Sequence, residues 1–461
     1  MASTNTVSTQ LKSMRDYYES GATRTYAFRK KKLQVLKAGI LKYEEEINEA
    51  LFLDLKKSKE ATYATETGLV LADINMALKN LHRWMKHERV KTNLLNFPSS
   101  GRIIHDPKGV VLIIAPWNYP LNLLLLPLVG AIAGGNCAVL KPSEVAPATA
   151  GVIEKIINEI FPPEYIKVYQ GEGSEMIPAL MQDFRFDHVF YTGSKAVGKS
   201  IYQMAAKDLI PVTLELGGKS PAIIESDADL ITSAKRIVLG KFLNAGQTCV
   251  APDYLLVNDD IKEKFILELK KTIDQFFGDN PQKSDDYGKI INEKRFDKLM
   301  AYLDQGEIVS GGKHERSTLY IEPTILKNIS ADAPIMNEEI FGPILPVIGF
   351  TNPEEALSII KKNKNPLAFY VFTSDKNKEK LWLEKVAFGG GCVNNTIWHL
   401  SNPHLPFGGI GNSGIGAYHG KSSFSVFTHA KPVMKTPSWF DPALKYPPFK
   451  GKLKLFKFLI K

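Results

Sequence analysis

The chain has 461 residues, of which 44% are hydrophobic and 10% aromatic, and its formal net charge is +9 at pH 7. This length and composition predict two or three packed domains and exclude an intrinsically disordered protein. The positive charge fits an anionic partner such as a phosphorylated cofactor, a membrane surface or nucleic acid, but it does not choose among them.

The three cysteines, Cys137, Cys249 and Cys392, are too few and too scattered for a disulfide framework. They form no CxxC or Cys/His spacing, so we expect no metal site and a reducing, cytoplasmic location. The N-terminus lacks the apolar core of a signal peptide. The only long apolar run, from Leu121 to Leu140, contains Pro127 and three glycines, which predicts a buried helix and strand rather than a transmembrane helix.

In the N-terminal part, apolar residues recur at spacings of three and four from Thr25 to Lys57, which predicts an amphipathic helix. A second helix is predicted from about Ala61 to Lys86, and a strand over Arg102–His105. The β-branched run Gly109–Ala115 is typical of a strand buried on both faces of a parallel sheet.

Strand and helix patterns then alternate with short connections, which predicts a doubly wound parallel sheet. The expected elements are helices over about 121–133 and 148–160 and strands over 137–140, 166–169 and from His188. Near Gly193 a strand, a glycine turn and a helix start suit a nucleotide phosphate, although no GxGxxG motif is present.

The alternation restarts after Glu215, with strands over 222–224 and 254–257 and helices over about 230–243 and 261–277. This second unit runs to about Val393, and the glycine-rich coil 406–414 ends it. The fold class is therefore α/β, with two doubly wound, Rossmann-like parallel-sheet domains.

Cys249 ends a short polar, glycine-containing loop and is the candidate nucleophile, because a thiol there can be activated by backbone N–H groups or a base. Glu215 ends a strand just before two glycines and is the candidate base. Each signal alone is weak: a lone cysteine is more often a small buried hydrophobe, and a glutamate before Gly-Gly can simply close a turn.

Seven segments together resemble the signature segments of the NAD(P)-dependent aldehyde dehydrogenases, in order along nearly the whole chain. They are residues 116–120 (PWNYP), 141–144 (KPSE), 192–194 (TGS), 215–219 (ELGGK), 246–249 (GQTC), 338–343 (EEIFGP) and 406–409 (PFGG). The short N-terminus and residues 286–292 and 414–421 resemble the class 3 branch, whose members are typically homodimers that oxidise medium- to long-chain aliphatic or aromatic aldehydes.

The resemblance implies that the Cys249 thiolate attacks the aldehyde, while the Asn118 amide and the Cys249 backbone N–H bind the oxyanion. Glu215 then activates water to hydrolyse the thioester. It also implies the cofactor-binding residues Lys141, Ser143, Glu144, Thr192, Gly193, Ser194, Gly198, Leu216, Gly217, Glu339 and Phe341. A carboxylate at Glu144 favours NAD, because it repels the 2′-phosphate of NADP, but class 3 relatives often accept both.

An apolar substrate channel is expected from Trp117, Tyr119, Ile397, Leu400 and Phe407, although the same residues could form plain core. Many relatives outside this branch carry a lysine, sometimes assigned to proton relay, where this chain has Pro127. The resemblance implies a cofactor domain of residues 1–89 and 106–214, a catalytic domain of residues 215–405, and oligomerisation segments 90–105 and 406–445. It places the dimer interface at a β arm near 90–105 and a C-terminal strand near Ser422–Thr428.

The tail, residues 446–461, combines lysines with apolar residues. On a helix Lys450, Lys454, Lys457 and Lys461 share one face, which is typical of a peripheral membrane anchor. Docking of the tail on the protein itself, or over the substrate mouth, fits the same pattern.

Two other functions remain open from the residues. One is a cysteine hydrolase of nitrilase or amidase type that uses Cys249, Glu215 and a lysine such as Lys219, and the other is a binding protein that has lost activity. The hydrolase leaves segments 141–144 and 193–194 unexplained. A variant that passes the thioester to coenzyme A or phosphate is disfavoured by Glu215, which selects water. We expect no nucleic-acid partner.

Overall fold

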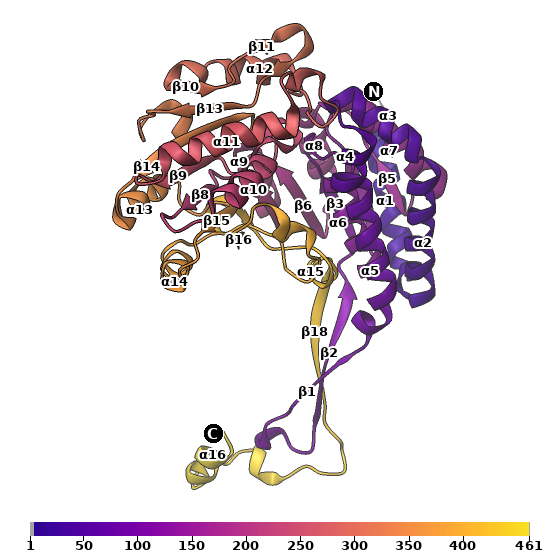
Figure 1. Cartoon of the computed structure of the whole chain (residues 1–461). Helices are drawn as coiled ribbons and strands as arrows, with labels where there is room; N and C mark the ends of the chain where they lie inside the picture. Colours follow the sequence, from indigo (N-terminus) through magenta and orange to yellow (C-terminus); the bar gives the residue numbers. More distant parts are fainter. Residues whose placement is uncertain (1–3, 461) are drawn as a thin grey trace.

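A computed structural model describes residues 4–460, and Figure 1 shows two parallel sheets with their helices above a long, thin arm. The predictions for residues 1–3 and for Lys461 lie outside these described residues. Each sheet is covered by helices, and its central strands are almost completely buried, as expected for parallel sheets.

The N-terminal helices pack along one side of the first sheet (Figure 1). Their bounds are α1 (Thr4–Glu19), α2 (Tyr26–Lys42), α3 (Glu44–Leu55), α4 (Lys59–Thr62), the π-helical turn η2 (Tyr63–Thr67) and α5 (Gly68–Met85).

The prediction of one helix from Thr25 to Lys57 is wrong, because the chain breaks at Tyr43 into α2 and α3. The first turn of α3 carries Glu44, Glu45 and Glu46, which are favourable at the positive end of a new helix. The break lets α3 turn onto α7 while α2 packs on α5, so both short helices bury their apolar faces.

The first sheet has six strands in the order β17-β7-β6-β3-β4-β5, and all but β17 are parallel. Its strands are β3 (Val110–Ile114), β4 (Cys137–Lys141), β5 (Ile166–Val168), β6 (His188–Gly193), β7 (Val212–Leu216) and β17 (Gly414–Ile415). The helices between them are α6 (Asn122–Gly134), α7 (Pro147–Ile160), α8 (Gly173–Asp183) and α9 (Lys195–Lys207). The predicted strands all form, and α8 was not predicted.

The second sheet has seven strands in the order β10-β13-β14-β9-β8-β15-β16, with only β10 antiparallel. They are β8 (Pro221–Ile224), β9 (Tyr254–Asn258), β10 (Glu307–Ser310), β13 (Thr324–Lys327), β14 (Ile344–Phe350), β15 (Ala368–Phe372) and β16 (Gly390–Val393). Its helices are α10 (Leu230–Phe242), α11 (Lys262–Phe277), α12 (Glu293–Met300), α13 (Pro353–Lys362) and α14 (Lys376–Lys385), and a small hairpin joins β11 (His314–Glu315) to β12 (Tyr320–Ile321).

The arm is a three-stranded antiparallel sheet in the order β1-β2-β18. Its strands are β1 (Glu88–Val90), β2 (Ser100–Pro107) and β18 (Thr428–Lys435). The strand predicted near Ser422–Thr428 is therefore wrong, because residues Lys421–Val426 form helix α15 and the strand begins at Thr428. The helix forms because it buries Phe424 against Trp84 and His105, which an extended chain at the sheet edge could not do.

The C-terminal tail ends in α16 (Leu453–Leu459), at the far tip of the arm and away from both sheets (Figure 1). This helix is shorter than the sequence pattern predicts, since Gly451 adopts a left-handed conformation just before it. Within the described residues, no helix is both long and apolar enough to cross a membrane.

Candidate active site

One cleft of about 660 Å³ lies where the two sheets meet. Its walls come from the carboxyl ends of β3, β6 and β7 on one side, and from the loops before β8, β9, β14 and β15 on the other. The carboxyl edge of the first sheet therefore faces the amino edge of the second. Among the residues that line the cleft are Trp117, Asn118, Thr192, Gly193, Ser194, Glu215, Leu216, Gly217, Cys249, Glu339, Phe341 and Phe407.

The loop that carries Cys249 begins with a left-handed turn. Asn244, Ala245 and Gly246 have φ values of 54°, 52° and 74° in succession. Such values are unfavourable for residues with a Cβ, by roughly 1–2 kcal/mol each. At Gly246 a side chain would also collide with the backbone carbonyl of Gly342. The turn therefore has an unfavourable conformational energy, and contacts with surrounding residues must stabilise it.

Side-chain amides supply those contacts. The Asn118 side chain donates to the carbonyl of Gln247 at 3.0 Å, and the Asn244 side chain donates to the carbonyl of Asn118 at 2.9 Å. The Gln247 side chain donates to Lys289 O at 2.9 Å and accepts from Ile291 N at 3.0 Å. The Tyr119 hydroxyl bonds to Thr248 Oγ1 at 2.6 Å. The position of Cys249 is therefore fixed from both sides.

The Cys249 thiol is protonated in this arrangement. Burial raises its pKa to about 12, and the nearby Glu339 and Glu215 carboxyl groups act in the same direction. The backbone N–H groups of Cys249 and Val250 lower the pKa, because they hydrogen-bond the sulfur. A thiolate would form once a base or a positive charge enters the cleft.

Glu215 is 2% exposed, and neither of its carboxyl oxygens has a hydrogen-bond partner within residues 4–460. Burial raises the pKa of this carboxyl well above its usual value. The residue lies at the end of β7, opposite Gly414 of β17. A buried, unpaired carboxyl group with a raised pKa is the form expected of a general base that works near neutral pH.

On the first sheet, α9 begins at the cleft. Ser194 is its N-cap and accepts from Val197 N at 3.4 Å. The helix N-terminus and the adjoining residues Thr192–Ala196 line the cleft, so its free N–H groups and dipole are available to an anion. Gly198 lies one turn inside, where a side chain would collide with Leu216.

Lys141 and Glu144 lie at the carboxyl end of the neighbouring strand β4. The Lys141 ammonium donates to Glu144 Oε2 at 2.7 Å, and Glu144 Oε1 accepts from Gly173 N at 3.1 Å. Although partial burial opposes the shift, these hydrogen bonds lower the pKa of Glu144, which keeps the carboxylate charged. Together with half-buried Glu144, Lys141 thus offers a donor and an acceptor at one place.

Glu339 lies against the glycines that follow β7. A side chain at Gly217 would overlap the Glu339 carboxyl group, and the Gly218 N–H donates to it. Burial, reinforced by Asp253, raises the pKa of Glu339 to about 8. Its neighbour Phe341 packs edge-on against Trp117 at 5.3 Å between ring centroids. This end of the cleft therefore combines an acid with an aromatic wall.

These groups fit a dinucleotide. The α9 N-terminus suits a pyrophosphate, and the carboxylate of Glu144 and the carboxyl group of Glu339 suit ribose hydroxyls at the two ends. Lysines and arginine at the cleft, including Lys195 and Arg295, complement the negative charge of such a ligand.

The structure does not bring all the expected residues to the cleft. Lys141, Ser143, Glu144 and Gly198 lie outside its lining, as do Tyr119, Ile397 and Leu400. Of the expected substrate channel, Trp117 and Phe407 line the cleft, whereas Tyr119 and Ile397 are 8% and 7% exposed and belong to the buried core. Tyr119 and Ile397 are therefore residues of the hydrophobic core, the alternative considered for the expected channel residues.

Arg295 was not predicted at the cleft, and Lys219 was named only as the lysine of the alternative cysteine hydrolase. Arg295 donates to Ile340 O and lies over the Phe341 ring, and Lys219 forms a buried ion pair with Asp253 at 2.6 Å. Lys219 also donates to Ile335 O at 2.8 Å, so it holds the loop that carries Glu339. A lysine directly after two glycines is a usable signal, but Arg295 lies in an ordinary amphipathic helix and gives none.

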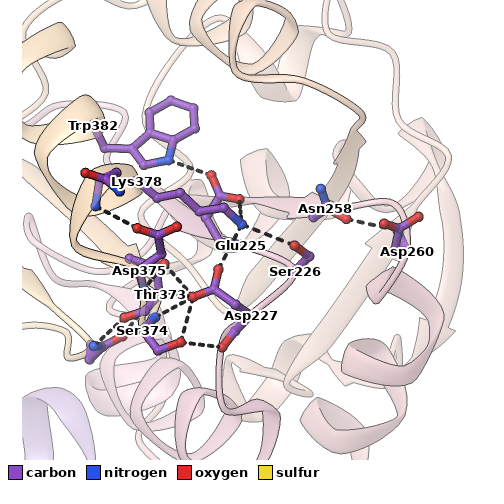
Figure 2. A network of polar contacts seen from close by, with 12 residues as sticks. Glu225, Ser226, Asp227, Asn258, Asp260, Thr373, Ser374, Asp375, Lys378 and Trp382 are labelled. Carbon is purple, nitrogen blue, oxygen red and sulfur yellow. Dashed lines mark hydrogen bonds and ion pairs between the residues drawn. The ribbon is translucent and has the colours of Figure 1, made fainter.

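The opposite, carboxyl edge of the second sheet is filled by its own side chains (Figure 2). Asp227 accepts from the backbone N–H groups of Ser374 and Asp375 at 2.6 and 2.9 Å, at the start of α14. Lys378 bridges Asp227 and Glu225 at 2.9 and 3.0 Å, and Trp382 donates to Glu225 at 2.7 Å. This edge resembles a nucleotide-binding edge in topology, but its carboxylates already occupy the helix N-terminus.

Two parallel α/β sheets that share one cleft, with a cysteine on a constrained loop and a cradle for a dinucleotide, define a class of nucleotide-dependent enzymes. The chain belongs to the aldehyde dehydrogenase family, whose model matches residues 1–433. It is an NAD(P)-dependent enzyme that oxidises aldehydes to carboxylic acids. The hydrolase and inactive-protein alternatives find no support.

Relatives match over almost the whole chain. A 4,4'-diaponeurosporen-aldehyde dehydrogenase of Staphylococcus aureus is 46% identical over 447 residues, 96% of this chain and 97% of its own length. A dimeric, NADP-preferring aldehyde dehydrogenase of Rattus norvegicus is 40% identical over 451 residues, 97% of this chain and 99% of its own. Several relatives are named as family 3 members, which confirms the class 3 resemblance.

Solved structures confirm the fold. A substrate-bound Staphylococcus aureus AldH has a TM-score of 0.96 and 45% identity, covering 98% of this chain and 99% of that one. An NADP-dependent glyceraldehyde-3-phosphate dehydrogenase of Bacillus halodurans, solved with NADP, has a TM-score of 0.84 and 26% identity, covering 94% of this chain and 92% of that one.

Proposed function

We propose that Cys249 is the nucleophile of this aldehyde dehydrogenase. The observation that carries the proposal is its place in the shared cleft, with backbone N–H groups on the sulfur and Asn118 alongside. The Cys249 thiol gives its proton to a base, for which Glu215 is the candidate, and Sγ then adds to the aldehyde carbon to form the oxyanion of a thiohemiacetal. This oxyanion accepts hydrogen bonds from the Cys249 N–H and from the Asn118 amide N–H that Gln247 leaves free. A nicotinamide cofactor bound in this cleft would supply the hydride acceptor, and loss of hydride from the thiohemiacetal would leave a thioester on Cys249.

Glu215 is the proposed general base for thioester hydrolysis. Its carboxylate takes a proton from water, the resulting hydroxide adds to the thioester carbonyl, and the Cys249 sulfur leaves with the acid as product. The raised pKa of the buried carboxyl makes it basic enough for this step. With Pro127 on α6, the proton passes from Glu215 through backbone groups or water.

For the cofactor, we propose Lys141, Ser143 and Glu144 at the adenine ribose, Thr192, Gly193, Ser194 and Gly198 at the pyrophosphate, and Leu216, Gly217, Glu339 and Phe341 at the nicotinamide end. The proposed cofactor domain, residues 1–89 and 106–214, then contains most of the first sheet, to which the end of β7 and strand β17 also belong. The proposed catalytic domain, residues 215–405, contains the second sheet. The cleft at their contact supports this division.

The proposed substrates are medium- to long-chain aliphatic or aromatic aldehydes. Trp117, Leu123 and Phe407 give the cleft an apolar wall that would bury such a chain. The relative that acts on diaponeurosporen aldehyde supports a long apolar substrate.

The test is NADH formation at 340 nm from octanal, with wild type and Cys249→Ala and with NAD and NADP in parallel. We expect turnover with wild type and none with the variant, while NAD still binds to both. Normal turnover by Cys249→Ala would reject the nucleophile. A panel of butanal, octanal and benzaldehyde tests the substrate class separately from the nucleophile. If the proposed substrate class is wrong, the wild type prefers butanal.

We propose that the chain forms a homodimer through its arm. The β18 edge of the arm sheet carries no further strand within the described residues, and most of its side chains are exposed. A relative named as dimeric supports the proposal. Sedimentation should give twice the chain mass of 51.3 kDa, and a species near 51.3 kDa at micromolar concentration would contradict the dimer.

We also propose a cytoplasmic protein that binds membranes peripherally through its tail. All three cysteines are free, which suits a reducing compartment. Leu453, Phe458 and Ile460 are 64%, 66% and 65% exposed, and lysines lie among them. Flotation with anionic vesicles should carry the full chain but not a chain that ends at Tyr446. A full-length variant with Lys450, Lys454 and Lys457 replaced by Glu is the matched control of equal length, and it should also fail to float. Equal flotation of the full chain, the shortened chain and this variant rejects the anchor.

A further inference from the structure

A buried ion pair lies behind the proposed oxyanion donor. Lys57 Nζ lies 2.6 Å from Glu66 Oε1, and the two side chains are 4% and 0% exposed. Lys57 follows α3, and Glu66 lies in the π-helical turn η2 between α4 and α5. Such turns occur often at functional sites, because they cost energy that a straight helix would not.

Lys57 holds the residue that we propose as oxyanion donor. Its ammonium donates to the backbone carbonyl of Asn118 at 3.1 Å and lies 4.1 Å from the centroid of the Tyr119 ring. Tyr119 in turn bonds to Thr248, the residue before Cys249. One cation therefore contacts the backbone of the donor and the side chain that steadies the nucleophile loop.

Glu66 holds the other end of the same segment. Its second oxygen accepts from Asn122 N at 2.8 Å, and it also accepts from Leu121 N. These are the first free N–H groups of α6, whose N-cap residue Leu121 has no polar side chain. Glu66 thus caps α6 from another helix, and the pair holds the chain from Asn118 to Asn122 at both ends.

We propose that Lys57 and Glu66 are positioning residues for aldehyde oxidation, which fix the Asn118 backbone so that its amide points at the oxyanion over Cys249. This inference rests on the proposed role of Asn118. A shift of about 1 Å in such a group can cost on the order of 100-fold in rate. Lys57 itself is not among the residues that line the cleft.

Removal of Lys57 alone would leave Glu66 charged and buried, and could unfold the protein. The test variant is therefore Lys57→Met/Glu66→Gln, because the carbonyl of the new glutamine side chain can still accept from the N–H groups of α6. The matched control is Lys59→Met/Glu45→Gln, which removes an exposed ion pair of 2.5 Å between α4 and α3 in the same part of the chain. We expect kcat for octanal to fall about 10- to 100-fold in the test variant, with an unchanged KM for NAD. The control should keep wild-type kcat.

Combining Lys57→Met/Glu66→Gln with Asn118→Ala shows whether the ion pair positions Asn118 or only stabilises the fold. If the pair acts through Asn118, adding Lys57→Met/Glu66→Gln to Asn118→Ala lowers kcat by less than about twofold, because contacting residues are non-additive. A further loss equal to that seen in the wild-type background overturns the inference. Wild-type turnover by Asn118→Ala would instead reject the proposed role of Asn118. Unchanged kcat in the Lys57→Met/Glu66→Gln protein, with Asn118→Ala impaired, rejects the positioning role alone.

Discussion

The side-chain amide of Asn118 donates to the backbone carbonyl of Gln247 at 3.0 Å, which ties the end of the first sheet to the loop of Cys249. One N–H of this amide is thereby used to orient it, and the other is the proposed donor to the oxyanion. Asn118 thus links the loop that follows β3 of the first sheet to the loop that precedes β9 of the second.

Asn118→Ala should lower kcat for octanal by about 10²- to 10³-fold, the usual loss for one oxyanion donor. Asn118→Asp should be at least as impaired, since a carboxylate of the same size cannot donate and repels the oxyanion. Steady-state kinetics check both variants, with NAD affinity as the control. A loss of less than about threefold in both would rule out the donor role.

Glu215→Gln should stall the reaction after hydride transfer, because water is no longer activated. Rapid mixing with octanal and NAD should show one NADH per active site in a burst, followed by slow turnover. In the wild type, kcat should rise with pH through the raised pKa of Glu215, since only the carboxylate is a base. Loss of that acid limb in the variant is the second check, and a normal steady rate without a burst would contradict the assignment.

The same substitution should stabilise the fold. The folded-state pKa of Glu215 is raised by burial, so the neutral form is favoured in the folded protein. The contribution of protonated Glu215 to the free energy of unfolding is complete below the pKa of about 4.5 that the residue has in the unfolded chain. It is lost as pH rises through the raised pKa of the folded protein. Glu215→Gln avoids that loss, so its Tm at pH 8 should exceed that of the wild type. The difference should vanish near pH 4, and a lower Tm at pH 8 would contradict it.

Glu144→Ala should shift the cofactor preference toward NADP. Glu144 is held as a carboxylate by Lys141 and Gly173 N, so it would repel a 2′-phosphate and accept ribose hydroxyls. The ratio of kcat/KM for NAD to that for NADP should fall by about tenfold, roughly the effect of one lost charged hydrogen bond. Glu172→Ala, on a nearby exposed residue, is the control, and an unchanged ratio would place the ribose elsewhere.

Asp227→Ala should destabilise the second sheet without changing the chemistry. The carboxylate caps α14 and pairs with Lys378 (Figure 2), and its removal should cost about 1–3 kcal/mol of unfolding free energy. Although burial opposes the shift, these bonds hold the pKa of Asp227 well below its usual range. Its contribution is thus present above the unfolded pKa of about 3.9 and is lost as pH falls. Denaturant unfolding at pH 7 and pH 3 should show a smaller difference between wild type and variant at pH 3, because the contribution is lost only as pH falls through the lowered folded pKa. The variant should keep wild-type kcat at denaturant concentrations below the unfolding transition.

The parallel strands of the first sheet and two strands of the second, β8 and β9, could be predicted from sequence because buried parallel strands, such as residues 110–114, are continuous apolar runs. The other five strands of the second sheet were not predicted. Helix ends set by packing could not: the break at Tyr43 follows from how α3 meets α7, and Lys421–Val426 is helical because Phe424 has a buried place to fill. Local propensity is weak at such positions, and tertiary contacts decide them.

In the site, residues in distinctive motifs could be predicted, whereas residues that contact the site residues without lining the cleft could not. Cys249 and Glu215 stand beside glycines in a recognisable order, but Lys57 looks like any lysine after a helix. The left-handed turn at Asn244 and Ala245 was equally hidden, because neither residue type requires that conformation. Only the assembled contacts reveal what the turn does.

The pairing of β17 with β7 sets an order of events during synthesis. Gly414 lies opposite Glu215, so the strand that flanks the proposed base comes from the last part of the chain. After the other strands of both sheets have been synthesised, the cleft still lacks the strand that flanks Glu215. The Cys249 thiol and its proposed base therefore reach their final surroundings only after residues 414–415 have been made and have joined the first sheet.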